Sequence, residues 1–320
     1  MDLLRGTVRS YLSRRPSATW ADFAQALGVA GLAVPEEYGG AGCGPEEVAS
    51  VARELGRALS PQPFLQTAVL AVEALKRDGD REARERLLPP LAEGSTTATV
   101  IFASPSYLPG PTPQNHLELA NGSLSGEAPY VLEGDLVLVY AGGHLAEARP
   151  AAREPYTTMD TTRPLSRLVF DRTPATILGG DAHMEEVRAL GIAALAAEQA
   201  GGAERCLEAA VEYAKQRRQF GQPIGAFQAI KHKLADVALL VESARSAALA
   251  AHESATNAAI AGAYCGDAYL RAAGENIQVH GGIGITWEHD AHRYFKRATS
   301  DARLFRTPRE HRELLARELF

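Results

Sequence analysis

Three long, alanine-rich runs with helical periodicity occupy the C-terminal part of the chain, and they constrain the fold more than any other feature. They cover residues 185–217, 226–253 and 256–279, and a shorter run begins at residue 308. At 1.5 Å rise per residue, each long run corresponds to a helix of about 35–50 Å. Long helices with a continuous apolar stripe pack side by side, so residues 181–320 are predicted to form a four-helix bundle. The stripe of the first run consists of Ile192, Ala196, Ala203, Leu207 and Ala210.

Helical periodicity also dominates the first 95 residues. A turn-rich stretch at residues 34–42 interrupts it, and Pro45 restarts it. Proline followed by two acidic residues suits the first turn of a helix, whose free N–H groups favour negative charge. Residues 1–95 are therefore predicted to form an N-terminal helical domain. The other expected helices are 2–14, 20–29, 63–77 and 80–92.

Between these helical parts, over residues 96–180, the apolar residues recur with a period of two, which is typical of strands. Clusters of Gly, Pro, Asn and Ser separate the short apolar runs and indicate turns. A small middle β-domain with an antiparallel sheet or barrel is expected, which makes the fold class α+β. The predicted strands are 97–102, 117–119, 130–132, 136–140 and 168–170.

Composition excludes several classes of protein. With 33 Lys and Arg against 39 Asp and Glu the formal net charge is −6, which weighs against nucleic-acid binding. No stretch approaches the ~18–20 apolar residues of a membrane span, so a cytoplasmic protein is expected. The three cysteines are far apart, and no disulfide framework or zinc site is expected. No metal site is expected at His289 and His292 either, because their neighbours are typical of an ordinary helix surface.

Three short motifs occur in order along the chain. Residues 27–42 read LGVAGLAVPEEYGGAG, residues 217–228 read RRQFGQPIGAFQ, and residues 278–284 read QVHGGIG. Together they resemble the motifs of the acyl-CoA dehydrogenase family. The resemblance implies that family's fold, in which two helical domains flank a β-domain, and it implies FAD as the cofactor.

The second and third motifs contain the expected cofactor contacts. A guanidinium at Arg217 suits bidentate contacts to a diphosphate, and in the family the corresponding arginine contacts the FAD pyrophosphate of a neighbouring subunit. Gly281 and Gly282 permit close approach of the backbone to a ligand, and the family pattern places them against the adenosine half of FAD. Alternatively, Arg217 complements a helix dipole and the glycines cap a helix. The six expected contacts are Arg217, Phe220, Gln228, Gln278, Gly281 and Gly282.

The catalytic base of the family is missing from its expected positions. Dehydrogenation of an acyl thioester needs a carboxylate that takes the α-proton while the β-hydrogen leaves as hydride to the flavin. Most relatives have this glutamate shortly before the last helix, where this chain has Arg306, which cannot accept a proton. Others place it 29 residues before the phenylalanine of the arginine motif, where this chain has Gly191. Glu186 and Glu198 lie five or more residues from Gly191, which displaces them by about 7 Å or more along the helix.

Other segments also depart from the family. Residues 104–110 stand where relatives have a Thr-Glu-Pro-x-x-Gly-Ser-Asp segment that meets flavin and substrate, and Arg297 stands where an acid is expected. The chain is short for the family, and the resemblance places the shortening in the β-domain. Arg306 is expected to fill space, to pair with an acid across a subunit contact, or to meet a thioester carbonyl or a CoA phosphate.

Retained cofactor contacts and a lost base together predict half of a shared site. The chain resembles the smaller, base-less subunits of heteromeric (α2β2) acyl-CoA dehydrogenases from actinobacterial sterol degradation. The resemblance implies a homologous larger subunit with the catalytic Glu, an electron-transfer acceptor and an acyl-CoA substrate, with steroid-derived thioesters as one class. The lone chain is then expected to be inactive. Two alternatives stay open: a self-sufficient homo-oligomeric dehydrogenase with its base at Glu198 or Glu288, and a non-catalytic helical scaffold.

Overall fold

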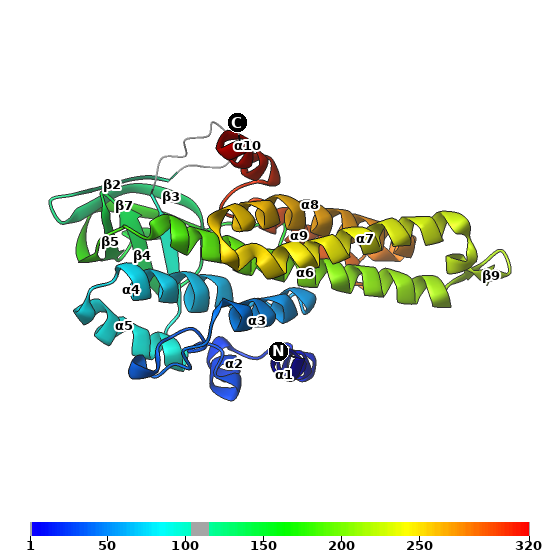
Figure 1. Cartoon of the computed structure of the whole chain (residues 1–320), viewed down its shortest axis with the longest axis horizontal. Coiled ribbons are helices and arrows are strands. Elements are labelled where there is room, and N and C mark those ends of the chain that lie inside the picture. The colour runs from blue at the N-terminus through cyan, green and yellow to red at the C-terminus, as the bar shows by residue number, and fades with distance from the viewer. Residues whose placement is uncertain (1, 104–114, 320) are drawn as a thin grey trace. The chain divides into compact units, whose positions relative to one another are not determined.

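Figure 1 shows the computed structural model, which describes residues 2–103 and 115–319. Helices come first along the chain, strands follow and long helices end it, which confirms the predicted α+β class. The chain divides into two compact units, and helices α3 (Pro45–Arg57) and α6 (Met184–Gln216) contribute residues to both. Unit 1 consists of Arg14–Val51 and Pro61–Gly191, and unit 2 of Asp2–Ser13, Ala52–Ser60 and Ile192–Phe320.

The helices of unit 1 are short, and α2 has a clear cap at each end. At the start of α2 (Trp20–Leu27), Thr19 accepts a hydrogen bond from the Asp22 N–H and the Asp22 carboxylate accepts one from the Thr19 N–H. This capping box satisfies two N–H groups that the first turn leaves free. The helix ends at Gly28, whose φ of 67° suits glycine at a C-terminal cap. The others are the first half of α3, a π-helical segment (Leu65–Ala71) that continues as α4 (Val72–Asp78), and α5 (Arg81–Glu93).

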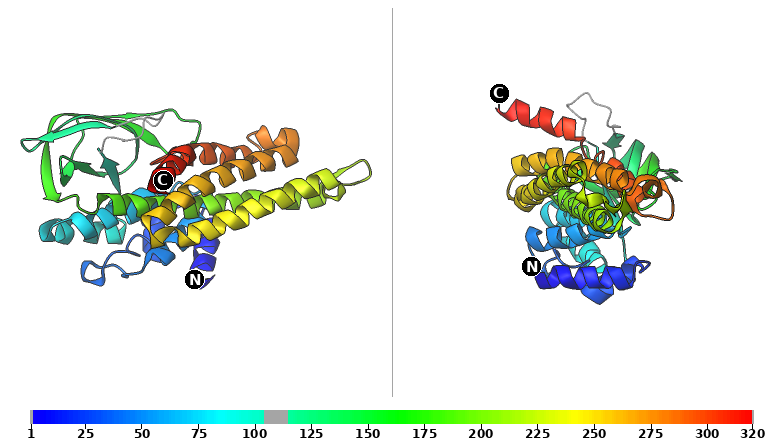
Figure 2. Two further views of the ribbon diagram at one scale, coloured as in Figure 1. Left: turned by 45° about the horizontal axis from the view of Figure 1, so that its top comes forward. Right: turned by 90° about the vertical axis from the view of Figure 1, so that its right-hand side faces the viewer.

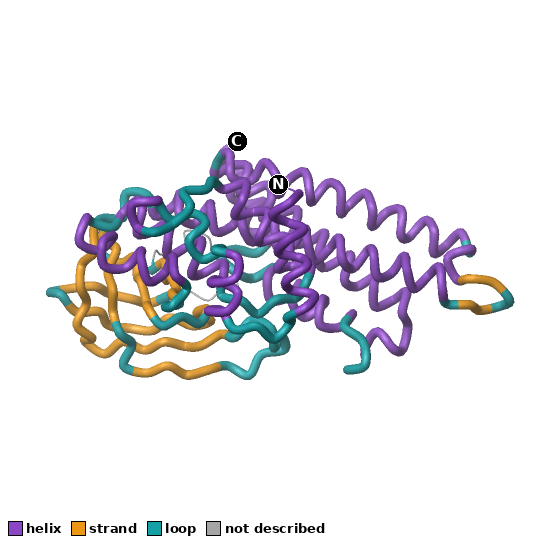
Figure 3. The backbone as a smooth tube through the Cα atoms, turned by 90° about the horizontal axis from the view of Figure 1, so that it is seen from below, coloured by secondary structure: helices purple, strands orange, loops and turns teal. Residues whose placement is uncertain are grey.

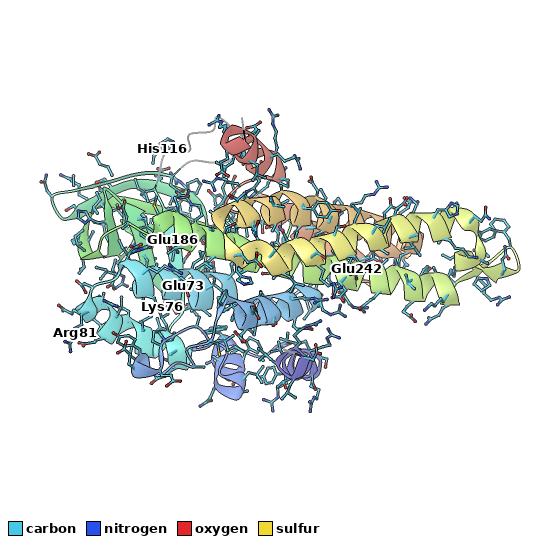
Figure 4. The ribbon with its side chains drawn as sticks, in the orientation of Figure 1. Glu73, Lys76, Arg81, His116, Glu186 and Glu242 are labelled. Atoms are coloured by element: carbon cyan, nitrogen blue, oxygen red, sulfur yellow. The ribbon has the colours of Figure 1, made fainter. Side chains whose placement is uncertain are left out.

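Ion pairs join α4 to the beginning of α6 within unit 1. Glu73 contacts Lys76 at 2.6 Å and Arg77 at 3.1 Å, and Arg77 also reaches Glu186 at 2.6 Å. Figure 4 labels Glu73, Lys76 and Glu186 on these two helices. Glu186, one of the acids near the second position of the family base, is therefore engaged in an ion pair.

The seven strands of unit 1, among those drawn orange in Figure 3, form a curled sheet in the order β1-β4-β5-β7-β3-β2, with β6 also paired to β7. Among the described residues its strand pairs are antiparallel except β1 and β4, which run parallel. The predicted wholly antiparallel sheet is wrong at this pair, because the chain makes the β2–β3 hairpin before it returns to β1. The strands are β1 (Ala98–Phe102), β2 (His116–Ala120), β3 (Ser123–Leu132), β4 (Leu136–Ala141), β5 (His144–Ala148), β6 (Ala152–Pro155) and β7 (Leu165–Gly179).

The sheet buries one apolar face, as the alternating pattern predicts. Val139 from β4 and Leu168 and Phe170 from β7 are at most 2% exposed and belong to one cluster. Strand β6 is exposed along its whole length, so it has no apolar alternation by which the sequence could reveal it.

Unit 2 contains the long helices that the periodicity predicts, and Figure 2 shows them running alongside one another. Helix α8 packs against α7, α9 and α10, and α6 is the longest at 33 residues, or about 50 Å. Helix α9 follows a glycine-rich segment, has 11 residues and was not predicted as a separate element. In the described part of the chain no helix has the length and apolarity needed to cross a bilayer. The bounds are α1 (Asp2–Arg14), α7 (Gln228–Ala250), α8 (Ala255–His280), α9 (Ala291–Asp301) and α10 (Pro308–Leu319).

Small residues allow the helices of unit 2 to pack closely. The second half of α3 touches α6 almost backbone to backbone: a Cβ on Gly56 would lie 1.9 Å from the Glu198 carbonyl oxygen. A Cβ on Gly201 would lie 2.0 Å from the Arg53 carbonyl oxygen. Alanine and glycine in these helices are therefore required by helix spacing. The core cluster contains Leu59, Ala203, Cys206, Val237, Val241, Tyr269, Ala272, Ala273, Tyr294 and Ala298.

Candidate functional site

All six expected cofactor contacts lie at one end of unit 2. There α6 leads into the two-stranded hairpin of β8 (Arg218–Gln219) and β9 (Gln222–Pro223), and the chain then enters α7 (Figure 2). We call residues 210–234 together with 278–290 the hairpin end. The Tyr213 ring contacts the His280 ring at 4.2 Å between centroids, which brings the second and third motifs together. An apolar cluster beneath them contains Ala210, Ala214 and Val279, with Tyr213, Ile224, Ile230 and Leu234 packed against it.

Arg217 is anchored through its backbone and free at its side chain. Its N–H donates to the Tyr213 carbonyl at 2.8 Å, and its carbonyl accepts from the Ile224 N–H at 2.8 Å. The side chain is exposed, and among residues 2–103 and 115–319 no hydrogen-bond or ion-pair partner meets it. The hairpin thus holds the base of this side chain in place and leaves its guanidinium available to an anion.

Phe220 occupies an unfavourable position for a phenylalanine. With φ of 49° at Phe220 and 78° at Gly221, the two residues form the tight turn between β8 and β9, and both lie in the left-handed region. A bulky residue is rarely found there. The side chain is 91% exposed, and its ring meets only the edge of Phe227 at 6.1 Å among the ring contacts of the described chain. Exposure and backbone strain together make this ring a candidate for contact with a ligand.

The two glycines Gly281 and Gly282 of the third motif differ in backbone conformation. Gly281 has φ of 64° and ψ of −142°, a conformation that is essentially restricted to glycine, and its N–H donates to the Ile277 carbonyl. It therefore does cap α8, as the alternative interpretation predicts. Gly282 has no positive φ, and a Cβ there would meet no atom within 4 Å. The open backbone at Gly282 permits close approach of a ligand.

Both glutamines are exposed at the same end of the bundle. Gln228 is the first residue of α7, and Gln278 lies in the last turn of α8. The hairpin end therefore presents two amides, a guanidinium, an aromatic ring and an open glycine backbone to the outside.

The histidines near the third motif are engaged in ring contacts. His280 lies between the Tyr213 and His289 rings, each 4.2 Å away, and shares a 2.8 Å hydrogen bond between its Nδ1 and the Asn276 carbonyl. Burial lowers the pKa of His280, so the neutral ring donates to that carbonyl. The Nδ1 of His289 accepts from the Ala291 N–H at 3.1 Å. Among the described residues no group of three or more His, Cys, Asp or Glu has a geometry that holds a metal ion.

Trp287 is a surface feature that the sequence analysis did not identify as functional. It is 73% exposed, and Ile285 two residues earlier is 69% exposed. The Lys296 Nζ lies 4.2 Å from the indole centroid, and the His292 ring meets it edge-on at 4.6 Å. The available signal was the row of apolar residues Ile283, Ile285 and Trp287, all of which the structure leaves exposed.

Arg306, which holds the position of the missing base, lies directly before the capped start of α10. Arg306 is half-buried between α9 and α10 and follows Phe305, whose φ is 61°. The nearby Glu310 accepts hydrogen bonds from the N–H and Oγ1 of Thr307 at 2.7 and 2.8 Å, and the Glu310 N–H donates back to that hydroxyl at 3.2 Å. This is a capping box, with Pro308 as the first residue of α10. The carboxylate nearest to Arg306 in sequence therefore caps a helix.

Glu198 is buried in an ion pair inside unit 2. The Nη1 of Arg297 lies 2.5 Å from Glu198 Oε1, and the two side chains are only 2% and 8% exposed. The Nη2 of Arg297 also donates to the Ser60 carbonyl at 3.0 Å. Arg297, which departs from the family pattern, is thus the partner of Glu198. A carboxylate held by a permanent cation in a helix interior is poorly placed to take a substrate proton.

Two further parts of the sequence analysis concern Glu288 and the segment 104–110. Glu288 is exposed in the turn before α9. The segment 104–110, which replaces part of the family's flavin contacts, lies outside the described residues.

Comparison with known proteins agrees with the three motifs and with the fold. Residues 9–95 match the acyl-CoA dehydrogenase N-terminal domain, and residues 164–319 match the acyl-CoA dehydrogenase C-terminal domain. Acyl-CoA dehydrogenase IpdE2 of Mycobacterium tuberculosis is 41% identical over 293 residues, which are 91% of this chain and 83% of that protein.

Two solved structures of complexes have closely similar chains. The ChsE4-ChsE5 complex from Mycobacterium tuberculosis aligns with a TM-score of 0.87 and 26% identity over 99% of this chain and 96% of that chain. A variant of the Tcur3481-Tcur3483 steroid ACAD also gives a TM-score of 0.87 and 26% identity, over 98% and 96% of the two chains. By sequence, domain matches and fold, this chain belongs to the acyl-CoA dehydrogenase family.

Proposed function

We propose that this chain is the smaller, base-less subunit of a heteromeric, FAD-dependent acyl-CoA dehydrogenase. One observation carries the proposal: the hairpin end presents unpartnered ligand-binding groups, while the acids nearest to the family's base positions are engaged elsewhere. The complexes among the similar structures support a heteromeric assembly, and the words steroid ACAD in one description support a steroid-derived acyl-CoA as substrate class.

The residues of the hairpin end fit the parts of FAD. The free guanidinium of Arg217 suits the diphosphate, and the exposed ring of Phe220 offers a flat apolar surface. The backbone at Gly282 lets the adenosine half approach closely, because no side chain covers it. Bound FAD would supply the acceptor for the hydride that leaves the β-carbon of the thioester.

The residues at and near the family's base positions do not supply the proton acceptor. Arg306 is permanently protonated, Glu310 caps α10, and Glu198 is paired with Arg297. Removal of the α-proton therefore needs a carboxylate from a homologous larger subunit. In this assembly the present chain binds and orients the flavin, and the partner performs the proton transfer.

Co-expression with a homologous larger acyl-CoA dehydrogenase tests the proposal. The lone chain is expected to purify with little FAD and without thioester oxidation, and the co-purified complex is expected to be yellow and active with an artificial electron acceptor. Arg217→Ala in the complex is expected to lower bound flavin at least tenfold, because a charge-assisted contact to the diphosphate is lost. Glu288→Gln and Glu198→Gln serve as controls for a relocated base.

The alternatives predict different results in the same experiment. A self-sufficient enzyme predicts stoichiometric flavin and turnover in the lone chain, and loss of turnover in Glu288→Gln, or in Glu198→Gln with the circular dichroism spectrum of the folded chain retained. A helical scaffold predicts that Arg217→Ala leaves the flavin content of the complex unchanged. Either result would contradict the proposal.

A further inference from the structure

We propose that Lys231 is a second cation for the FAD diphosphate, beside Arg217. The inference rests on the proposed function, and it concerns a residue that lies outside the three family motifs. It follows from the charges of the hairpin end, from the partners of each cation there, and from the position of Lys231 on α7.

The charge of the hairpin end differs from that of the whole chain. The two segments of the hairpin end, residues 210–234 and 278–290, contain five Lys or Arg residues and three acids, Glu212, Glu288 and Asp290, whereas the chain as a whole has a net charge of −6. A local excess of positive charge on an acidic protein favours an anionic ligand at that place.

Three of the five cations already have partners within the chain. Lys215 lies 3.1 Å from Glu212, and the Nη2 of Arg218 donates to the Gly221 carbonyl at 2.8 Å. Lys233 lies 2.7 Å from a carboxylate oxygen of Glu275 on α8. Within the described part of the chain, Arg217 and Lys231 are the two of these five without a hydrogen bond or an ion pair, and both are exposed.

Lys231 stands on the face of α7 that carries an expected cofactor contact. It follows Gln228 by three residues, and residues three apart are neighbours on a helix surface. Its N–H donates to the Phe227 carbonyl at 3.1 Å, and the Phe227 ring meets Phe220. The Ile224 N–H in turn donates to the Arg217 carbonyl. A short, hydrogen-bonded stretch of chain thus joins the two free cations.

The chemistry of a diphosphate matches this pair. A diphosphate diester carries two negative charges, and the planar guanidinium binds two oxygens while an ammonium acts as a mobile point charge. Coenzyme A also contains a diphosphate, so the same pair of cations suits either ligand chemically. FAD is favoured because Gln228, on the same face as Lys231, belongs to the arginine motif that contacts FAD in the resemblance.

The experiment measures FAD binding to the co-expressed heteromeric complex. We expect Lys231→Ala to raise the Kd of FAD about tenfold and to weaken its salt dependence, because one charge-assisted contact is removed. Lys231→Arg should retain tight binding. Lys215→Ala is the matched control, since this lysine lies at the same end but is paired with Glu212. Size-exclusion chromatography checks that each complex assembles.

Distinct outcomes separate the inference from the proposed function. If Arg217→Ala weakens FAD binding and Lys231→Ala does not, the inference is wrong while the proposed function stands. If neither change affects FAD, both fail. If Lys231→Ala leaves the Kd of FAD unchanged and raises the KM for the acyl-CoA, the lysine serves the diphosphate of CoA, and the assignment to FAD is overturned.

Discussion

The interior of unit 2 and its hairpin end differ in whether all their charged side chains have partners within the chain. Inside, Glu198 is paired with Arg297, and the fully buried Glu54 side chain accepts hydrogen bonds from Arg5 at 3.1 Å and Arg9 at 2.8 Å. At the hairpin end, the side chains of Arg217 and Lys231 have no hydrogen-bond or ion-pair partner in the described chain. Burial of a charge is costly unless it is paired, so the pairing of the interior ions is a requirement of folding. Exposed ions without partners are not needed for folding, so they are available to a ligand.

Glycine positions show the same contrast. Gly56 and Gly201 lie where a Cβ would strike the backbone of a crossing helix at 1.9–2.0 Å, so they serve the packing. Gly282 lies where a Cβ would meet open space. The same residue type thus marks helix contact inside the bundle and an open surface at its end.

The largest expected effect comes from breaking the buried ion pair. Arg297→Met leaves the Glu198 carboxylate uncompensated in the bundle, and we expect a loss of about 3–5 kcal/mol in the free energy of unfolding. Chemical denaturation followed by circular dichroism measures it. The double variant Glu198→Leu with Arg297→Met should recover most of that loss, because apolar side chains of similar volume replace the pair.

Arg217→Met is the matched change at the hairpin end. It also removes a guanidinium, but from an exposed position, and is expected to alter the free energy of unfolding by less than about 0.5 kcal/mol. An equal loss of stability in the Arg297 and Arg217 variants would remove the distinction between the two regions.

The next effect concerns pH and a buried histidine of α10. His311 is 2% exposed, and its ring lies where a Cβ on Gly262 would be 2.5 Å from Nε2. Burial, assisted by the positive charge of Arg306, lowers the pKa of His311 from 6.5 to about 4. Between these values the unfolded chain binds a proton that the folded chain excludes, so the free energy of unfolding falls as pH decreases from 6.5 to 4. A shift of this size corresponds to at most about 3 kcal/mol.

Denaturation midpoints at pH 8, 6, 5 and 4.5 test this pH dependence. His311→Asn is expected to lower stability at pH 8 through altered packing, but to show a shallower decline toward pH 4.5 than the unaltered chain. The slope is the readout, because a packing defect alone shifts all midpoints together. Parallel pH profiles for the two chains would show that His311 is not the group that titrates.

The sequence predicts the elements whose pattern is local and misses those that depend on distant contacts. Helices α6, α7 and α8 were predicted closely because each carries an apolar stripe over many turns. The parallel pairing of β1 with β4 was missed because it joins segments that are separated by a hairpin. Strand β6, fully exposed, has no pattern from which to predict it.

The candidate site shows the same limit at the level of single residues. Arg217 and the glycine turn are recognisable because the residue types recur in the family motifs. Arg297 looks in the sequence like a lost acid, and only the structure shows its pairing with Glu198, 99 residues away. Lys231 was missed because its lack of a partner depends on its surroundings and not on the residue type. Trp287 was missed for the same reason, because its exposure also depends on its surroundings.

A small gain in stability is expected from a change in the turn of the hairpin. Phe220→Asn creates an Asn-Gly pair, the preferred sequence for a turn in which both residues have positive φ. We expect a gain of about 0.5–1 kcal/mol in the free energy of unfolding, because asparagine tolerates the left-handed region better than phenylalanine. FAD retention in the heteromeric complex is expected to fall, since the ring that faces outward is removed.

Phe220→Leu separates the ring from the backbone conformation. Leucine keeps an apolar side chain and the same unfavourable φ, so stability should stay as in the unaltered chain while flavin binding weakens through loss of the flat aromatic face. Thermal denaturation gives the first quantity and bound flavin per complex the second. If Phe220→Asn stabilises the chain and flavin retention stays unchanged, the strained phenylalanine does not serve the cofactor. The distinction between interior groups that serve folding and groups of the hairpin end that serve a ligand would then rest on the charged residues alone.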